Sequence, residues 1–442
     1  MGQNIWRSLL LGSRVPQLLR NPKALGAASL TLADVLSKAI GFAITPYMAN
    51  RMGSAEFGAL NLYISVTQIL IFLIALGGPA LIAAEYVRNG YASARQMRAA
   101  NLKLAGWISA ALIIVSLVVS IWLPTVVPMT SGALTVAVSC VQALNMIELS
   151  YYRGAQTYGV AVAGQFMFTI LNVLLTVVAF EFNSPTVTNR LLSIVLAGGL
   201  VQIAYALELG RKRYEPAVKT TMRLDNSMIV RFGISIFPHV ASGWIRMSVD
   251  RFFVSGYLGL AATGVYSVAV SLATAEILLF AAISQQLQPF LYRRLKSRNF
   301  AGFQRVQFLF IAAVLGFTAT YYGLVQLFFE LLFTSEFNGA KALLPALLGA
   351  SAAQSIFTNF SHAAFYERRA SSISWLSASA LFVHLAGLCG LALFNRLTLP
   401  NIVFVFFVSS VVAMLGMVWL SRRVIGQLRL APEELADQQE SG

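Results

Sequence analysis

Charged residues are scarce in this chain of 442 residues, where only 11% of the positions are Asp, Glu, Lys or Arg. A soluble domain carries about 25% charged residues, so this composition excludes a soluble protein. Acidic residues are the scarcer kind, 17 against 32 basic ones, which leaves a net charge of +15. The sequence has only two cysteines, Cys140 and Cys389, both inside apolar runs without metal-ligand spacing. We therefore expect small buried hydrophobic side chains there, rather than a disulfide or a metal site.

Long apolar segments dominate the sequence. Hydrophobic residues make up 57% of the chain, and the mean hydropathy is +0.72. Because about 20 consecutive apolar residues cross a bilayer as a helix, these segments predict an all-α integral membrane protein. Twelve transmembrane helices are expected, at residues 25–49, 57–84, 102–123, 132–152, 159–181, 191–209, 229–254, 260–288, 306–329, 341–365, 372–394 and 401–421. The first 23 residues are basic and lack the apolar core of a secretory signal, so none is expected.

The basic residues follow the pattern of a multi-pass membrane protein. Alternate connections, counted from the N-terminal arm, hold 25 Lys and Arg residues, whereas the opposite connections hold four, Arg51, Arg190, Lys341 and Arg396. Lys and Arg are enriched in cytoplasmic loops, so this split predicts that both termini lie in the cytoplasm. The basic residues are spread over short connections instead of gathering on a soluble domain, so no nucleic-acid partner is expected.

Two blocks, MGSAEFG at residues 52–58 and LGLAATG at residues 258–264, share glycines. Gly53 and Gly58 of the first block match Gly259 and Gly264 of the second, 206 residues later. We expect glycine at these positions to allow tight turns or close helix approach.

The repeated blocks also predict how the chain is divided. Six helices return the chain to its starting side, so the two halves form parallel six-helix bundles with the same orientation in the membrane. The predicted parts are a cytoplasmic N-terminal arm (1–24), an N-terminal bundle (25–209), a cytoplasmic linker (210–228), a C-terminal bundle (229–421) and a cytoplasmic tail (422–442).

Polar residues recur at helical spacing inside several predicted spans. Steps of three and four residues place each set on one face of a helix, and lipid does not solvate such a face. The sets are Thr31, Asp34, Lys38, Gly41 and Thr45; Asn61, Ser65 and Gln68; Gln165, Thr169, Asn172 and Thr176; His239, Ser242, Arg246 and Asp250; and Ser355, Asn359 and His362. Each face either lines water or holds helices together, and both interpretations stay open for the second and fifth helices.

Charged residues inside the spans are the strongest functional candidates. A charge at the bilayer centre costs at least about 2.5–3.5 kcal/mol, which argues against a purely structural role. Lys38 and Arg246 are therefore predicted to bind substrate, and Arg251 joins them unless its side chain extends to the outer interface. Asp34 and Asp250 lie four residues from Lys38 and Arg246. They are either coupling or charge-partner groups or the second members of simple neutralising pairs.

Other polar residues complete the candidate set. Glu276 has no local charge partner, which leaves a protonated core carboxyl and an ion-coupling group as alternatives. The predicted polar lining of a cavity consists of Gln165, Asn172, His239, Asn359 and His362. His384 is expected to be a hydrogen-bonded packing residue, and Glu148 to face cytoplasmic water. We recognise no catalytic residue, no metal site and no cofactor-binding motif.

The first outer block, MGSAEFGALNLY, resembles the "lGpeeFGlyal" pattern of the multidrug/oligosaccharidyl-lipid/polysaccharide (MOP) exporter superfamily. The second block, LGLAATGVYSVA, is a weaker copy that lacks the acidic and aromatic residues of the first. YYRGAQ (151–156) and LFTSEFNGAKALLPALL (332–348) extend the resemblance, which covers residues 25–421 and is nearest to Wzx-type polysaccharide flippases.

The resemblance implies the MOP fold, with twelve helices in two six-helix bundles around a central cavity. It implies that an undecaprenyl-diphosphate-linked oligosaccharide, an O-antigen, capsule or exopolysaccharide unit, is moved to the periplasmic leaflet of the bacterial inner membrane. The expected partners are this lipid-linked substrate, membrane lipids and other polysaccharide-assembly membrane proteins.

Two other functions fit parts of the sequence. A multidrug and toxin extrusion antiporter exports cations and favours an acidic cavity, whereas acids do not outnumber bases among the intramembrane residues. A membrane-bound polysaccharide polymerase or ligase would carry catalytic groups on large outer loops, and the predicted outer loops are short. We therefore favour an alternating-access flippase over the antiporter, and the antiporter over an enzyme.

Overall fold

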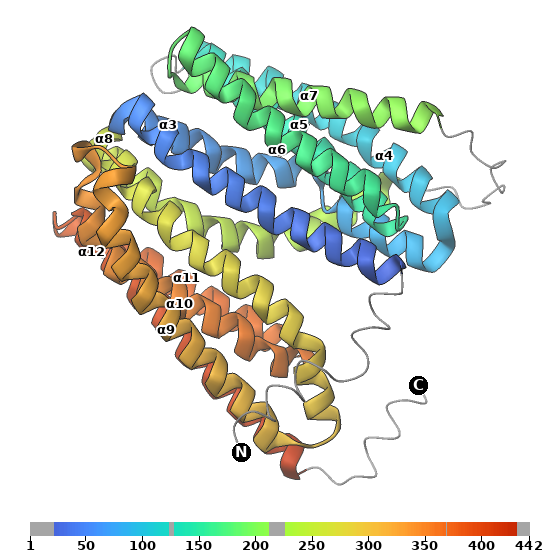
Figure 1. Cartoon of the computed structure of the whole chain (residues 1–442), viewed down its shortest axis with the longest axis vertical. Coiled ribbons are helices and arrows are strands. Elements are labelled where there is room, and N and C mark those ends of the chain that lie inside the picture. Colours follow the sequence, from blue (N-terminus) through green and yellow to red (C-terminus); the bar gives the residue numbers. More distant parts are fainter. Residues whose placement is uncertain (1–21, 123–127, 212–225, 368, 431–442) are drawn as a thin grey trace. The chain divides into compact units, whose positions relative to one another are not determined.

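The computed structural model describes residues 22–122, 128–211, 226–367 and 369–430, which form long helices and short connections (Figure 1). The α-helices are α3 (Pro22–Ala75), α4 (Gly78–Trp122), α5 (Met129–Gly154), α6 (Tyr158–Phe182), α7 (Val187–Arg211), α8 (Asn226–Lys296), α9 (Phe300–Leu332), α10 (Gly339–Tyr366), α11 (Ala370–Leu393) and α12 (Leu399–Leu430), and the short 3-10 helix η1 (Ser335–Phe337) precedes α10. All ten α-helices contain a stretch long and apolar enough to cross a membrane. The predicted all-α membrane fold is confirmed over these residues.

A glycine interrupts each of the two helices α3 and α8. Gly53 in α3 has φ 75° and ψ 170°, and Gly259 in α8 has φ 89° and ψ 175°. This combination of positive φ and extended ψ is essentially confined to glycine, because a Cβ atom would collide with the backbone. Each break divides one long helix into two apolar segments, which brings the ten helices to the twelve segments predicted. The expected turns at Gly53 and Gly259 are confirmed.

Gly58 and Gly264 lie where two backbones meet within one compact part of the fold. A Cβ atom on Gly58 would lie 2.0 Å from the carbonyl oxygen of Leu260, and one on Gly264 would lie 1.9 Å from that of Ser54. Ser54 and Leu260 are also 206 residues apart, so the two contacts are repeats of each other. Small residues let helices approach this closely. The expected close approach is therefore confirmed.

The segment 332–337 is attached to the first glycine block by hydrogen bonds. The Asn50 side chain donates to the carbonyl oxygen of Leu332 over 2.8 Å, and the Glu336 carboxylate accepts from the backbone N–H of Ser54 over 3.0 Å. Two of the sequence motifs that carry the family resemblance thus contact each other in space.

The connection predicted between the spans 57–84 and 102–123 is helical. The helix α3 ends at Ala75, and α4 begins at Gly78 after two residues of positive φ. It then runs through the whole predicted connection with one break at Gly90, where φ is 80°. The basic residues of this stretch therefore lie on a helix. A high content of Lys and Arg indicates a polar surface but does not distinguish a loop from a helix, which is why the sequence predicted a connection here.

The described residues divide into two compact units. Unit 1 contains those up to Thr45 and those from Tyr63 to Val240, and unit 2 contains those from Pro46 to Leu62 and those from Ala241 onward. The middle of α3 thus packs with C-terminal helices, and the start of α8 packs with N-terminal ones. The predicted bundles follow chain order and do not include this exchange of segments, so their boundaries stay a prediction.

The predicted terminal and linking segments fall largely outside the described residues, at 1–21, 212–225 and 431–442. The last helix, α12, continues to Leu430 instead of ending at residue 421. Both cysteines are free, Cys140 half-buried and Cys389 exposed on α11, so the expected burial is wrong for Cys389.

Candidate functional site

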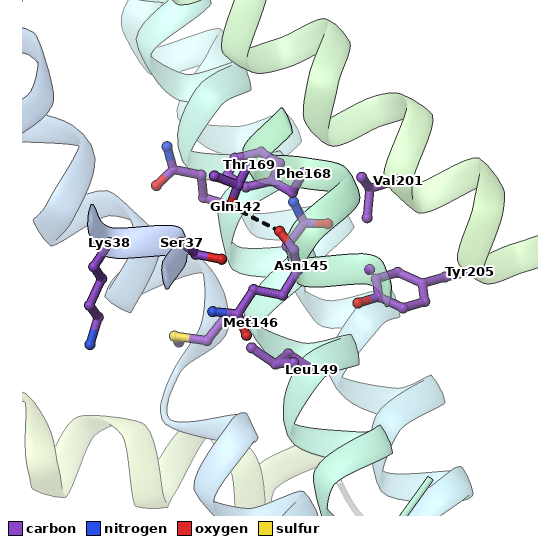
Figure 2. A pocket seen from close by; sticks show the side chains of 12 residues that line it. Ser37, Lys38, Gln142, Asn145, Met146, Leu149, Phe168, Thr169, Val201 and Tyr205 are labelled. Atoms are coloured by element: carbon purple, nitrogen blue, oxygen red, sulfur yellow. Dashed lines mark hydrogen bonds between the residues drawn. The ribbon is translucent and has the colours of Figure 1, made fainter. Parts of the chain in front are cut away.

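Unit 1 contains a cavity of about 320 Å³ (Figure 2). The residues that line it are Ser37 and Lys38 from α3; Gln142, Asn145, Met146 and Leu149 from α5; Gly164, Gln165, Phe168 and Thr169 from α6; and Val201 and Tyr205 from α7. Ligand sites in proteins measure about 300–1,000 Å³, so the cavity is large enough for a small ligand group. Its wall combines amide, hydroxyl and apolar groups with one cation, Lys38.

Close packing of α6 and α7 places the Tyr205 hydroxyl at this cavity. A Cβ atom on Gly164 would lie only 2.0 Å from the Tyr205 hydroxyl oxygen, so glycine leaves the room that the phenol ring occupies. On its other side, the ring stacks on that of Tyr152, with 5.2 Å between the ring centroids. The position of Tyr205 is therefore fixed by two neighbouring helices.

Asp34 connects Lys38 with two further polar residues of unit 1. Its Oδ1 atom accepts a hydrogen bond of 2.6 Å from Gln165 and lies 3.4 Å from Nη2 of Arg153. Its Oδ2 atom lies 3.9 Å from the Lys38 ammonium. The expected Asp34–Lys38 pair exists, but it is long, and both side chains are partly exposed. The charge of Lys38 is therefore only weakly compensated, and its side chain extends away from the other lining side chains (Figure 2).

Arg246 in unit 2 has neutral hydrogen-bond partners. It donates to the side-chain oxygen of Gln354 over 3.1 Å and to the Ser410 hydroxyl over 2.9 Å. Its guanidinium carbon lies 6.0 Å from the centroid of the Phe406 ring, and its buried Nε atom has no hydrogen-bond partner. Both Arg246 and Asp250 are described, and no ion pair joins them. The neutralising pair left open by the sequence is thus absent.

Asp250 is buried and bound to a histidine and a tyrosine. Its Oδ1 atom lies 2.7 Å from Nε2 of His384, and its Oδ2 atom accepts a hydrogen bond of 2.7 Å from the Tyr266 hydroxyl. His384 is fully buried, so the expectation that it is a hydrogen-bonded packing residue is confirmed. Its partner lies on another helix, which spacing along α11 does not reveal.

The remaining charged candidates, Arg251 and Glu276, also lie in unit 2. The Arg251 guanidinium donates to the backbone oxygen of Met247 over 3.1 Å. Glu276 is fully buried, with one carboxylate oxygen 2.5 Å from the Thr318 hydroxyl and the other without a hydrogen-bond partner. The substrate-binding role of Arg251 and the role of Glu276 stay predictions.

The residues predicted as a polar lining occupy different places. Gln165 lines the unit 1 cavity, whereas Asn359 and His362 are buried in α10. His362 lies 2.9 Å from the Ser284 hydroxyl, and the side-chain amide of Asn359 has no hydrogen-bond partner. The side chain of His239 lies outside the described residues. Within the described part of the chain, no group of three His, Cys, Asp or Glu residues could hold a metal ion.

Sequence spacing does not reveal two further buried contacts of unit 1. Glu148, expected to face water, is buried and forms a two-pronged ion pair with Arg98. Arg190, counted among the outer connections, is buried in α7 and donates to Asn172 and Thr176 of α6. The only sign of these contacts in the sequence is the presence of a charged residue, because spacing along one helix does not show which residue of another helix it meets.

Comparison with known sequences supports the family suggested by the motifs. The model of a family described as polysaccharide biosynthesis protein matches residues 24–294. A Haemophilus influenzae protein described as Lsg locus putative protein 1 is 20% identical over 271 residues, which cover 61% of this chain and 65% of that protein. An uncharacterized membrane protein of the same organism is 24% identical over 280 residues, covering 60% and 64%. The match thus spans less than two thirds of the length of either relative.

Solved transporter structures share the fold. The inward-facing conformation of a multidrug resistance MATE family transporter of the MOP superfamily gives a TM-score of 0.72 at 16% identity, covering 89% of this chain and 96% of that one. A crystal structure of MATE in complex with MaL6 gives 0.61 at 15% identity, covering 94% and 99%. Identities this low show the fold alone. With more than half of its length matched by the family model, the chain belongs to the polysaccharide biosynthesis protein family and is a multi-pass membrane protein with the MOP fold.

Proposed function

We propose that this protein is a flippase that moves an oligosaccharide linked to undecaprenyl diphosphate from the cytoplasmic to the periplasmic leaflet of the bacterial inner membrane. Membership of the polysaccharide biosynthesis family supports the substrate class, and the transporter fold supports movement across the membrane. The oligosaccharide is the repeat unit of an O-antigen, a capsule or an exopolysaccharide.

The observation that carries this proposal is the bonding of Arg246. Its guanidinium lies in an apolar helix and donates to an amide and a hydroxyl, neither of which cancels its charge. A charge at the bilayer centre costs at least about 2.5–3.5 kcal/mol, and an anionic ligand offsets part of that cost. The diphosphate of a lipid-linked oligosaccharide is such a ligand. Lys38 supplies a second cation, whose charge partner is Asp34, whereas Asp250 binds His384 and Tyr266 and leaves Arg246 free to pair with the substrate.

The unit 1 cavity suits the sugar part of such a substrate. Amide groups both donate and accept hydrogen bonds, as sugar hydroxyls do, and the lining includes Gln142, Asn145 and Gln165. One amide atom on each of Asn145 and Gln165 is buried without a hydrogen-bond partner. A bound sugar would supply those partners. The apolar lining, such as Phe168, then packs against the faces of the sugar ring.

The proposed orientation places both termini and residues 210–228 in the cytoplasm. It rests on the split of 25 to 4 basic residues between the two sets of connections. Membrane lipids and other polysaccharide-assembly proteins are the expected partners, since the translocated glycan must be assembled further.

A cation antiporter is the second candidate. The buried acids Asp250 and Glu276 favour it, because a buried carboxylate calls for a cation to offset its charge. Both observations fit one protein if cation movement drives glycan export. The antiporter alone, however, gives no role to Arg246.

Deletion of the gene in its native bacterium tests the proposal. Lipid-linked oligosaccharide should accumulate on the cytoplasmic leaflet, and a plasmid with the wild-type gene should remove it. A plasmid with Arg246→Ala should not, whereas Lys341→Ala, which alters an exposed ion pair with Glu330, should behave as wild type. Unchanged lipid-linked oligosaccharide together with greater sensitivity to cationic drugs would favour the antiporter.

A further inference from the structure

Arg190 is a buried cation without a counter-charge. The residue is 7% exposed, and its Nη1 atom donates to the Asn172 amide oxygen over 2.6 Å and to the Thr176 hydroxyl over 2.7 Å. Its Nε atom is also buried and has no hydrogen-bond partner. No carboxylate forms an ion pair with Arg190 among the described residues. Buried charges are normally paired, so this guanidinium lacks the anion that its environment calls for.

The position of Arg190 in its helix adds to the positive potential. It is the fourth residue of α7, in the first turn. The N-terminal end of a helix carries a partial positive charge and unpaired N–H groups, so it disfavours a cation and attracts an anion. The Arg190 charge and the N-terminal end of α7 therefore both favour an anion at this position.

A continuous polar face of α6 leads from the cavity to Arg190. Gln165 and Thr169 line the cavity, and Asn172 and Thr176 follow at steps of three and four residues on the same face. At 1.5 Å per residue, Gln165 and Thr176 are about 16 Å apart along the helix. Arg190 is thus the cation at the far end of this face, on the predicted outer side.

A purely structural link between α6 and α7 does not need a charge. Elsewhere on α7, Gln202 donates to Asn145 of α5 over 2.5 Å and joins two helices with neutral amides. The matching position in the second half offers a second comparison. Arg396, 206 residues after Arg190, is exposed. Burial of the cation is therefore particular to the first half, which holds the cavity.

We propose that Arg190 is an anion-binding residue of the transport path, which takes a phosphate group of the substrate as the glycan moves outward from the unit 1 cavity. This inference rests on the proposed function and adds a residue and a location to it. The same phosphate chemistry is present in phospholipid headgroups, so the experiment compares the two sources.

Binding to the purified full-length protein in detergent tests this role. The probes are a short-chain polyprenyl diphosphate, the matching polyprenol and phosphatidylglycerol, with thermal unfolding and titration as readouts. Wild type should bind the diphosphate more tightly than the other two. Arg190→Met should weaken diphosphate binding about 10- to 150-fold, the loss expected for a hydrogen bond to a charged group. Arg190→Lys should retain part of it, and Arg396→Met should bind as wild type.

The unfolding temperature without ligand separates this role from a structural one. Arg190→Met removes a buried, unpaired charge, so it should leave that temperature unchanged or raise it. A lower temperature with unchanged diphosphate affinity would show a structural link and overturn the inference. Preference for phosphatidylglycerol, lost in Arg190→Met, would also overturn it, because the site would then hold a lipid headgroup. A wild type that binds the diphosphate no better than the polyprenol would overturn the proposed function itself.

Discussion

At the scale of single residues, Asp250 contacts a histidine and a tyrosine, and Arg246 one turn away contacts an amide and a hydroxyl. Spacing of four residues brings two side chains to one face of a helix but does not decide which partners they take. Other helices supply three of the four partners, since His384 lies on α11, Gln354 on α10 and Ser410 on α12. The fourth, Tyr266, lies on α8 itself, beyond its break. Removal of Arg246 therefore leaves the bonding of Asp250 intact.

Export by Arg246→Ala should fall about tenfold or more at normal protein level, the loss expected for one hydrogen-bonded charge. Arg246→Lys should retain part of the activity because it keeps the charge without the guanidinium fork. The double variant Arg246→Ala with Asp250→Ala should stay inactive, since Asp250 does not neutralise Arg246. The readout is glycan export in a strain that lacks the native gene. Restored export in the double variant would assign the pair a structural role.

The buried pair Arg98–Glu148 should carry much more stability than the exposed pair Lys341–Glu330. Glu148→Ala leaves an uncompensated buried charge and should lower the free energy of unfolding by about 3–5 kcal/mol. Glu330→Ala, at an exposed pair that solvent screens, should lower the free energy of unfolding far less. Thermal unfolding of the purified variants measures both. Equal effects would mean that Glu148 faces water, as the sequence alone suggested.

At the scale of elements, matched glycines shape the helices α3 and α8. Gly53 and Gly259 give the backbone a conformation open only to glycine, and Gly58 and Gly264 remove the side chains between two touching backbones. Their shared spacing was readable from the sequence. That the two glycine blocks touch each other was not, because a repeat shows likeness and not contact.

Gly58→Ala and Gly264→Ala should destabilise the fold even though alanine favours helices. A Cβ atom placed 2 Å from a backbone oxygen can be accommodated only if the helices separate, and overpacking costs about 1–3 kcal/mol or more. Gly256→Ala is the matched control, since nothing lies within 4 Å of its Cβ position. Alanine there should stabilise α8 by up to about 1 kcal/mol. Equal melting temperatures for all three variants would show that the contact is not tight.

At the scale of the whole molecule, the sequence predicts the helical fold because apolar length and basic residues reflect the membrane directly. It predicts less about the site. Residues such as Gln165 and Lys38 were found by their spacing, whereas Gln142, Asn145 and Tyr205 were not, because the cavity is lined by four helices. The exchange of residues 46–62 and 226–240 between the units was not predicted for the same reason, since it depends on contacts between segments that are distant in the sequence.

The predicted orientation is testable on the intact protein. A reporter inserted near residue 220 should be active only in a form that works in the cytoplasm, since the surrounding linker is basic. A reporter inserted near residue 397 should behave in the opposite way. Periplasmic activity near residue 220 would reject both the orientation and the parallel repeat.

The central claim, transport of a lipid-linked glycan, is tested most directly in proteoliposomes. The protein is reconstituted with a fluorescent polyprenyl-diphosphate oligosaccharide, and the fraction of the glycan in each leaflet is followed with a membrane-impermeant quencher. Wild type should exchange the glycan between leaflets much faster than empty liposomes, and Arg246→Ala should approach the empty rate. Exchange by wild type no faster than in empty liposomes, with or without a proton or sodium gradient, would contradict the claim.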